Sequence, residues 1–249
     1  MKGVLYCMKK ILKYQCYDLI KVLVVYYIAI TLILFLILAG LRASNSQEIS
    51  RIGFAPEFFC FILGLCMFRE YFHLFTQNGV SRKTIFSGGC VSLLLFSAVI
   101  SVMDTLFLRI TDILPIYRMK YTNISSLLYT PFLNRVNTVT KVFTELILTF
   151  LVMYIFFSVG YLISIWFYRF PKPGKIGIAV GLPLLLIGGV PLLMVLFPDI
   201  FAGIFSFFLL IMGYSETSGG NPVIGMITLT VVSLAVTGLN YISVKGTQI

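Results

Sequence analysis

Charged side chains inside the long apolar stretches are the first candidates for chemistry, because an ionisable group within a membrane span is costly and usually functional. Asp104 and Glu145 fall near the ends of two consecutive apolar stretches, with Arg109 and Lys141 at a similar depth. An interfacial ion-pair cluster explains this set, and a proton relay is the alternative. A relay needs a carboxylate near mid-membrane, whereas Glu57 is expected at the outer edge of its span, so the pattern favours the ion-pair cluster.

Motifs for catalysis or nucleotide binding do not occur in the sequence. The single histidine is His73, and there is no HExxH, GxSxG or GxxxxGK[ST] pattern. The cysteines are odd in number, contain no CxxC and are interpreted as reduced apolar residues: Cys7, Cys16, Cys60, Cys66 and Cys90. We therefore expect no enzymatic activity, no metal and no cofactor bound by this chain.

The elements that hold these residues are predicted from composition. The chain has 249 residues, 59% of them hydrophobic and 11% charged, against about 25% charged in a soluble domain. Crossing a bilayer takes about 20 apolar residues in a helix. Six stretches meet this length, which predicts a single all-helical membrane domain over residues 1–249 with spans near 22–41, 54–72, 86–108, 142–167, 176–197 and 222–243.

The distribution of Lys and Arg predicts the orientation of these spans. With the N-terminus inside, 12 of the 19 basic residues fall on inner segments, as the positive-inside rule requires. Both termini are then cytoplasmic, in a multi-pass protein of the plasma membrane. The net charge of +10 is assigned to this topology and to membrane lipids, and no nucleic-acid partner is expected.

Three segments outside the spans also have distinct patterns. Residues 1–21 are basic with an apolar face, which predicts an amphipathic helix at the inner membrane surface. Residues 109–141 form the longest connection, an outer loop that either caps an exit or is semi-ordered. Residues 200–213 are apolar but too short to cross, which predicts a re-entrant or interfacial segment.

The fifth predicted span is rich in small and helix-breaking residues. Gly177 and Gly181 are four residues apart, a spacing that lets two membrane helices approach closely, and prolines within a span favour kinks. The candidate packing and pathway residues are Gly177, Gly181, Pro183, Gly188 and Gly189. Generic close packing without a pathway remains an equal alternative.

The longest polar interruption on the predicted inner side is residues 69–85. Residues 68–77 have helical composition, Asn78 and Gly79 form a turn dipeptide, and Ser81 offers an N-cap to the next span. A short rigid helix at the end of two spans suits docking to a cytoplasmic partner. An ordinary solvated loop with positive anchors is the alternative.

The order of these segments resembles the permease subunit of ABC-2 type transporters. Phe68-Arg-Glu-Tyr-Phe through Asn78-Gly-Val-Ser-Arg-Lys-Thr is similar to the family's segment between the second and third spans, which holds the coupling helix. The resemblance implies that the following residues dock to a separate ATPase: Arg69, Glu70, Phe72, His73, Leu74, Phe75, Gln77, Asn78, Gly79, Ser81 and Arg82. In size and low charge the chain looks most like small Gram-positive exporters of amphipathic peptides, such as the phenol-soluble modulin exporter.

What the resemblance implies is an ATP-driven exporter of amphipathic peptides or hydrophobic compounds. Two ABC ATP-binding subunits, which hold ATP and Mg, would bind two permease chains, either two copies of this one or this one and a related permease. The path would lie between the permeases, with the second and fifth spans contributing. Two other classes stay open: a proton-coupled secondary transporter, and a non-transporting scaffold or immunity protein that needs no coupling helix.

Overall fold

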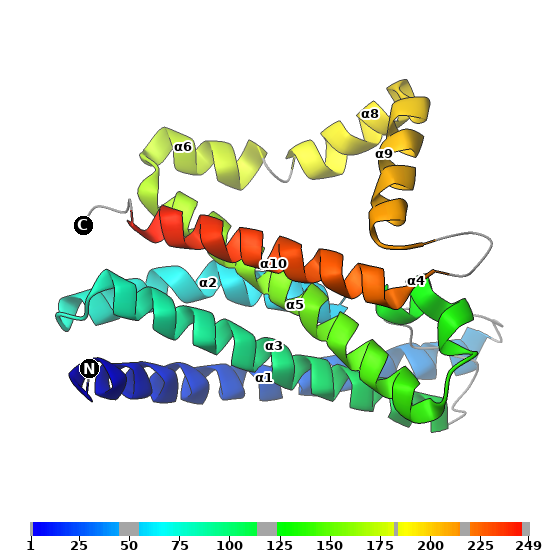
Figure 1. Cartoon of the computed structure of the whole chain (residues 1–249), viewed down its shortest axis with the longest axis horizontal. Coiled ribbons are helices and arrows are strands. Elements are labelled where there is room, and N and C mark those ends of the chain that lie inside the picture. The colour runs from blue at the N-terminus through cyan, green and yellow to red at the C-terminus, as the bar shows by residue number, and fades with distance from the viewer. Residues whose placement is uncertain (1, 45–54, 114–123, 182–183, 215–219, 246–249) are drawn as a thin grey trace.

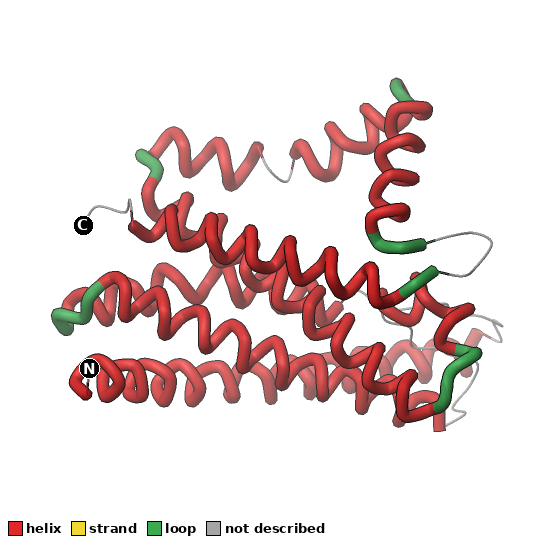
Figure 2. The backbone as a smooth tube through the Cα atoms, viewed as in Figure 1, coloured by secondary structure: helices red, strands yellow, loops and turns green. Residues whose placement is uncertain are grey.

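The computed structural model describes residues 2–44, 55–113, 124–181, 184–214 and 220–245. Every regular element in these ranges is helical, and a short loop joins α2 to α3 (Figure 2). The elements are α1 (Lys2–Ser44), α2 (Ala55–Gln77), α3 (Arg82–Ile113), α4 (Ile124–Leu133), α5 (Thr138–Arg169), α6 (Lys172–Ile176), η1 (Gly177–Gly181), η2 (Leu185–Gly189), α8 (Val190–Leu196), α9 (Pro198–Ile211) and α10 (Pro222–Lys245).

Five of the described helices are long and apolar enough to cross a membrane: α1 over Ile11–Ile33, α2, α3, α5 and α10. The pair α8 and α9 would make a sixth if it were counted as one span, but the two helices meet at a bend of 113°. The helices indicate a multi-pass membrane protein. Of the six predicted spans, all except the fifth coincide with one of these five helices.

The long helix α5 lies at the centre of the bundle, in contact with α2, α3 and α10 (Figure 1). Its buried residues pack with those of α1, α2 and α3 in one apolar core. Polar bonds join it to α10, because the Asn240 amide donates to the Ser158 hydroxyl at 2.8 Å and the Trp166 indole donates to the Ser243 hydroxyl at 3.2 Å. Apolar packing therefore holds α5 against its neighbouring helices, and the two hydrogen bonds fix its register against α10.

The predicted division of the N-terminal region into a surface helix and a span is wrong. Residues 2–44 form one helix of 43 residues, which at about 1.5 Å per residue is about 65 Å long, roughly twice the hydrocarbon thickness. Its early part packs on α3, where Ile11 covers Gly88 and Gln15 accepts a hydrogen bond from Ser92. Leu19 and Leu23, which lie on either side of the predicted boundary at residue 21, are buried in the same apolar core, so the helix packs continuously across it.

The fifth predicted span, 176–197, is not one regular helix. The chain there passes through α6, η1, η2 and α8, and both η segments are π-helical. The contacts of this segment run mainly along itself, from α6 to η1 and from η2 to α8. Figure 1 shows it to one side of α10, with α9 turning back toward the ends of α4 and α10. The predicted re-entrant stretch 200–213 corresponds to α9 and the two residues that follow it.

Most of the described part of the predicted outer loop 109–141 is helical. The third span continues to Ile113, and α5 begins at Thr138. Between them, the short helix α4 docks where α9 ends and α10 begins: the Tyr129 hydroxyl donates to the carbonyl oxygen of Met212, the residue after α9, at 2.6 Å, and the same side chain lies against Gly225 of α10. The part of the loop from 114 to 123 lies outside the described residues.

Candidate functional site

The turn between α2 and α3 is closed by a complete set of local hydrogen bonds. The N–H of Val80 donates to the Phe75 carbonyl and the N–H of Gly79 to the Thr76 carbonyl, both at 3.0 Å, and Gly79 has a φ of 72°. This is the Schellman ending, in which a left-handed glycine lets the last carbonyls of a helix be satisfied. The predicted turn at Asn78-Gly79 is confirmed, and its geometry is rigid.

The start of α3 is capped as predicted. The hydroxyl of Ser81 accepts the backbone N–H of Thr84 at 3.3 Å and lies 2.7 Å from the Thr84 hydroxyl. An N-cap of this kind satisfies one of the open N–H groups of the first turn and stabilises a helix by about 1 kcal/mol. Together with the Schellman ending, the cap fixes the direction in which α3 leaves the turn.

The predicted separate helix after the second span is wrong, because α2 runs unbroken to Gln77. Two of its predicted docking residues face the core: Phe72 is 1% exposed and Phe75 is 7% exposed. The ring of Phe72 contacts that of Tyr168 on α5, with 5.6 Å between centroids, and Phe75 stacks on Tyr71 at 6.0 Å. These aromatic residues anchor the end of α2, so they cannot form a surface for a partner.

The side chains that remain accessible form a polar surface, which we call the turn patch. It consists of the exposed residues Glu70, His73, Gln77, Asn78, Gly79, Ser81 and Lys83. The Gln77 amide nitrogen lies 3.1 Å from Nε2 of His73, and the Asn78 amide donates to the Leu74 carbonyl at 2.7 Å. Leu74 and Arg82 are half-buried at its edge. Of the predicted coupling residues, Arg69 has no described side chain.

The predicted close approach at Gly177 and Gly181 is not found among the residues that the structure describes. A Cβ atom at Gly177, Gly181 or Gly188 would meet no atom within 4 Å, and one at Gly189 would meet only Leu185 of the same segment. Pro183 lies outside the described residues. Within the described residues, this segment is therefore loosely contacted.

The tightest helix crossing lies instead between α2 and α5, at Gly64 and Gly160. A Cβ atom at either glycine would lie 2.2 Å from a backbone carbonyl oxygen of the facing helix. The sequence holds a signal for this crossing, because Cys60 lies four residues before Gly64 and Ser164 four residues after Gly160, the small-residue spacing of close-packed membrane helices. The larger number of glycines in the fifth predicted span favoured that span for close packing instead.

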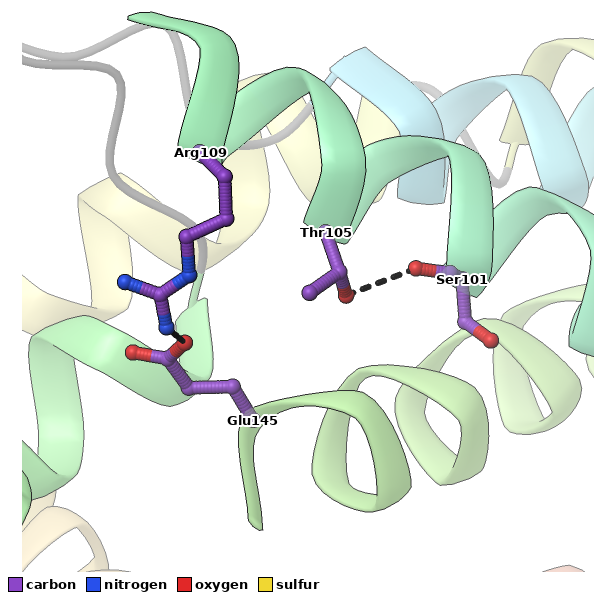
Figure 3. Close-up of polar contacts among 4 residues, drawn as sticks. All are labelled: Ser101, Thr105, Arg109 and Glu145. Carbon is purple, nitrogen blue, oxygen red and sulfur yellow. Dashed lines mark hydrogen bonds and ion pairs between the residues drawn. The ribbon is translucent and has the colours of Figure 1, made fainter. Parts of the chain in front are cut away.

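Two of the four residues predicted for the outer ion-pair cluster meet. The Arg109 guanidinium on α3 bonds the Glu145 carboxylate on α5 (Figure 3), with Glu145 only 1% exposed. In the same view, the Thr105 hydroxyl donates to the Ser101 carbonyl at 2.8 Å. Asp104 is buried on α3, and Lys141 is half-buried one turn before Glu145. The ion pair links α3 to α5 inside the bundle, so it is more than a surface contact.

Glu57 lies in the first turn of α2, which is consistent with its predicted place at the edge of the second span, but its side chain is buried and only 1% exposed. Within the described residues, no group of three or more His, Cys, Asp or Glu side chains is arranged to hold a metal ion. Glu57, Asp104 and Glu145 are thus three acidic side chains buried inside the bundle, and the sequence pattern alone did not reveal their burial.

Comparison of the chain with protein-family models, with curated proteins and with solved structures returned no match. The function of the chain is therefore inferred from its own residues and their geometry.

Proposed function

We propose that this chain is the membrane-embedded permease subunit of an ATP-driven exporter of the ABC-2 type, which moves amphipathic peptides or hydrophobic compounds out of the cell. ATP hydrolysis is assigned to a separate pair of ABC ATP-binding subunits, which carry ATP and Mg. A second permease chain, identical or related, completes the transporter.

The observation that supports this proposal is the construction of the turn patch. Its polar side chains sit on a turn whose backbone bonds are closed on both sides. Just behind it, Phe72 and Phe75 anchor α2 in the core. A push on the patch is therefore transmitted to α2 without a flexible joint, and from there to α5 through the crossing at Gly64 and Gly160. Such a lever can bias a packing arrangement that has two states.

The arrangement of the helix ends also supports the proposal. The start of α1, the end of α10 and the turn between α2 and α3 lie at the same end of the bundle (Figure 1). Most of the Lys and Arg residues that the positive-inside rule assigns to the inner side belong to this end. If it is cytoplasmic, the turn patch faces the compartment in which an ATP-binding subunit would dock.

The loosely contacted segment from α6 to α8 has a place in the same proposal. Its π-helical turns depart from regular helix pairing, and such turns are frequent at functional sites. Its exposed side chains include Val180, Leu184 and Leu192. In the proposed dimer this segment meets the second permease, and the path for an amphipathic substrate runs along it.

The test is co-purification in mild detergent with the ABC ATP-binding proteins encoded in the same genome, together with their ATPase rates. The informative variant is His73→Glu/Lys83→Glu, because both side chains are exposed and neither supports the core. The matched control is Asn137→Glu, exposed at the turn between α4 and α5, at the opposite end of the bundle in Figure 1.

We expect the wild type and the control to capture one ATP-binding subunit and to alter its ATPase rate, and the double variant to lose both effects. Equal capture by all three proteins would show that docking occurs elsewhere. If no ATP-binding protein is captured by the wild type under any mild condition, the permease proposal is wrong, and the scaffold or immunity hypothesis replaces it.

A further inference from the structure

Three helices bring polar groups together in the interior near the start of α2. Glu57 on α2 is 1% exposed, Asp104 on α3 is 2% exposed, and the hydroxyl oxygen of Tyr26 on α1 is buried. Contacts of α1 place the three groups at one junction. The Tyr26 ring stacks on that of Phe59, two residues after Glu57, with 3.7 Å between centroids. The neighbouring Tyr27 hydroxyl donates to the carbonyl of Ile100, one turn before Asp104, at 3.5 Å. We call Tyr26, Glu57 and Asp104 the buried acidic site.

Two of these groups lack the partners that buried polar atoms normally have. In the described part of the chain, Oε2 of Glu57 and the hydroxyl of Tyr26 accept and donate no hydrogen bond. The hydroxyl of Ser97, two helical turns before Asp104 on α3, is likewise buried and without a partner. Buried polar atoms are nearly always satisfied, so each exception requires a physical explanation.

The charges around Glu57 point to the missing partner. Among the described residues, the groups that interact with Glu57 are Tyr26 on α1, Cys60 one turn along α2 and Asp104 on α3, and none of them is a cation. The nearest described guanidinium on α3, that of Arg109, is bonded to Glu145 of α5. An ionised carboxylate buried beside a second acid, with no ion-pair partner among the residues that the structure describes, is strongly disfavoured.

We propose that the buried acidic site is a proton-binding site, and that Glu57 carries the proton. Protonation removes the negative charge of Glu57, so that the carboxyl group can stay buried beside Asp104 without a cation. The site is formed jointly by α1, α2 and α3. Any movement that opens their junction to water therefore releases the proton, and closure takes one up. This inference does not depend on the transport proposal.

The experiment is infrared difference spectroscopy of the full chain in lipid nanodiscs, recorded between acidic and alkaline pH in sodium-free buffer. We expect the carbonyl stretching band of a protonated carboxylic acid at neutral pH. The band should shift in D2O and on labelling with ¹³C-glutamate, and it should disappear in Glu57→Gln. The control Glu70→Gln removes an exposed glutamate from the same helix and should leave the band unchanged.

Three outcomes would overturn the proposal. One is the absence of any protonated-acid band at neutral pH, and another is a band that survives in Glu57→Gln. The third is a carboxylate signal at neutral pH that responds to added sodium, which would make the ligand a monovalent cation. If Glu57→Gln does not fold, Glu57→Asp decides, because the band must then respond to ¹³C-aspartate and no longer to ¹³C-glutamate.

Discussion

The crossing of α2 and α5 should be the contact most sensitive to one added methyl group. A Cβ atom at Gly64 would lie 2.2 Å from the carbonyl oxygen of Phe157 and 2.8 Å from the backbone nitrogen of Tyr161. A Cβ atom at Gly160 would lie 2.2 Å from the carbonyl oxygen of Phe61. All three obstacles are backbone atoms, so no side-chain rotation relieves the overlap and the helices themselves must separate.

The magnitude follows from that separation. Carbon atoms in contact prefer about 3.5 Å, so Gly64→Ala requires a local displacement of about 1 Å, and gaps of 0.5–1 Å already forfeit about a quarter to a half of each dispersion contact. Overpacking a core costs about 1–3 kcal/mol and occasionally more. Because backbone meets backbone, we expect about 3 kcal/mol for Gly64→Ala, which is about a 100-fold change in the unfolding equilibrium.

The assay is denaturant unfolding in detergent, followed by helical circular dichroism and by fluorescence of Trp166, the only tryptophan. The matched control is Gly238→Ala on α10, where a Cβ atom would meet nothing within 4 Å. In the double variant Gly64→Ala/Gly160→Ala, the loss should be smaller than the sum of the single losses, because the first methyl already parts the helices. Unfolding of Gly64→Ala at the same denaturant concentration as Gly238→Ala would refute this reasoning.

Two further variants test the ends of the bundle. Arg109→Gln leaves the buried carboxylate of Glu145 without its ion-pair partner and should lower the free energy of unfolding by about 3–5 kcal/mol; Arg109→Gln/Glu145→Gln should recover most of this, and an equal loss in both would contradict an ion pair within the bundle. Tyr129→Phe loses the hydrogen bond to Met212 and should cost about 1 kcal/mol. Burial raises the pKa of Tyr129, so its contribution should be complete below about pH 10 and decline at higher pH; stability curves of wild type and variant that stay parallel at alkaline pH would argue against burial of this hydroxyl.

Local signals were enough to predict the turn between α2 and α3. Gly79 permits the left-handed conformation and Ser81 supplies an N-cap oxygen, and both effects act within a few residues of the chain. The faces of α2 could not be predicted in the same way. This helix is apolar on nearly all sides, so its sequence does not distinguish Phe72 and Phe75, which face the core, from a side chain that faces out.

The fifth predicted span shows a different limit. Hydropathy records only that residues 176–197 are apolar and long enough to cross, and it takes no account of whether a regular helix forms. Its glycines and prolines weaken helical order, and among the described helices none packs closely against its middle. The same glycine signal is correct at Gly64 and Gly160, where a facing helix exists.

Composition and hydropathy thus establish a multi-pass helical protein, the places of five spans and the turn that joins α2 to α3. These properties depend on the transfer of side chains to an apolar environment and on hydrogen bonds between near neighbours, both of which are local along the chain. The glycine crossing, the ion pair of Arg109 with Glu145 and the buried site around Glu57 depend on which helix faces which. That choice is made by the packing of whole helices, and it is expressed only when residues distant in sequence come together.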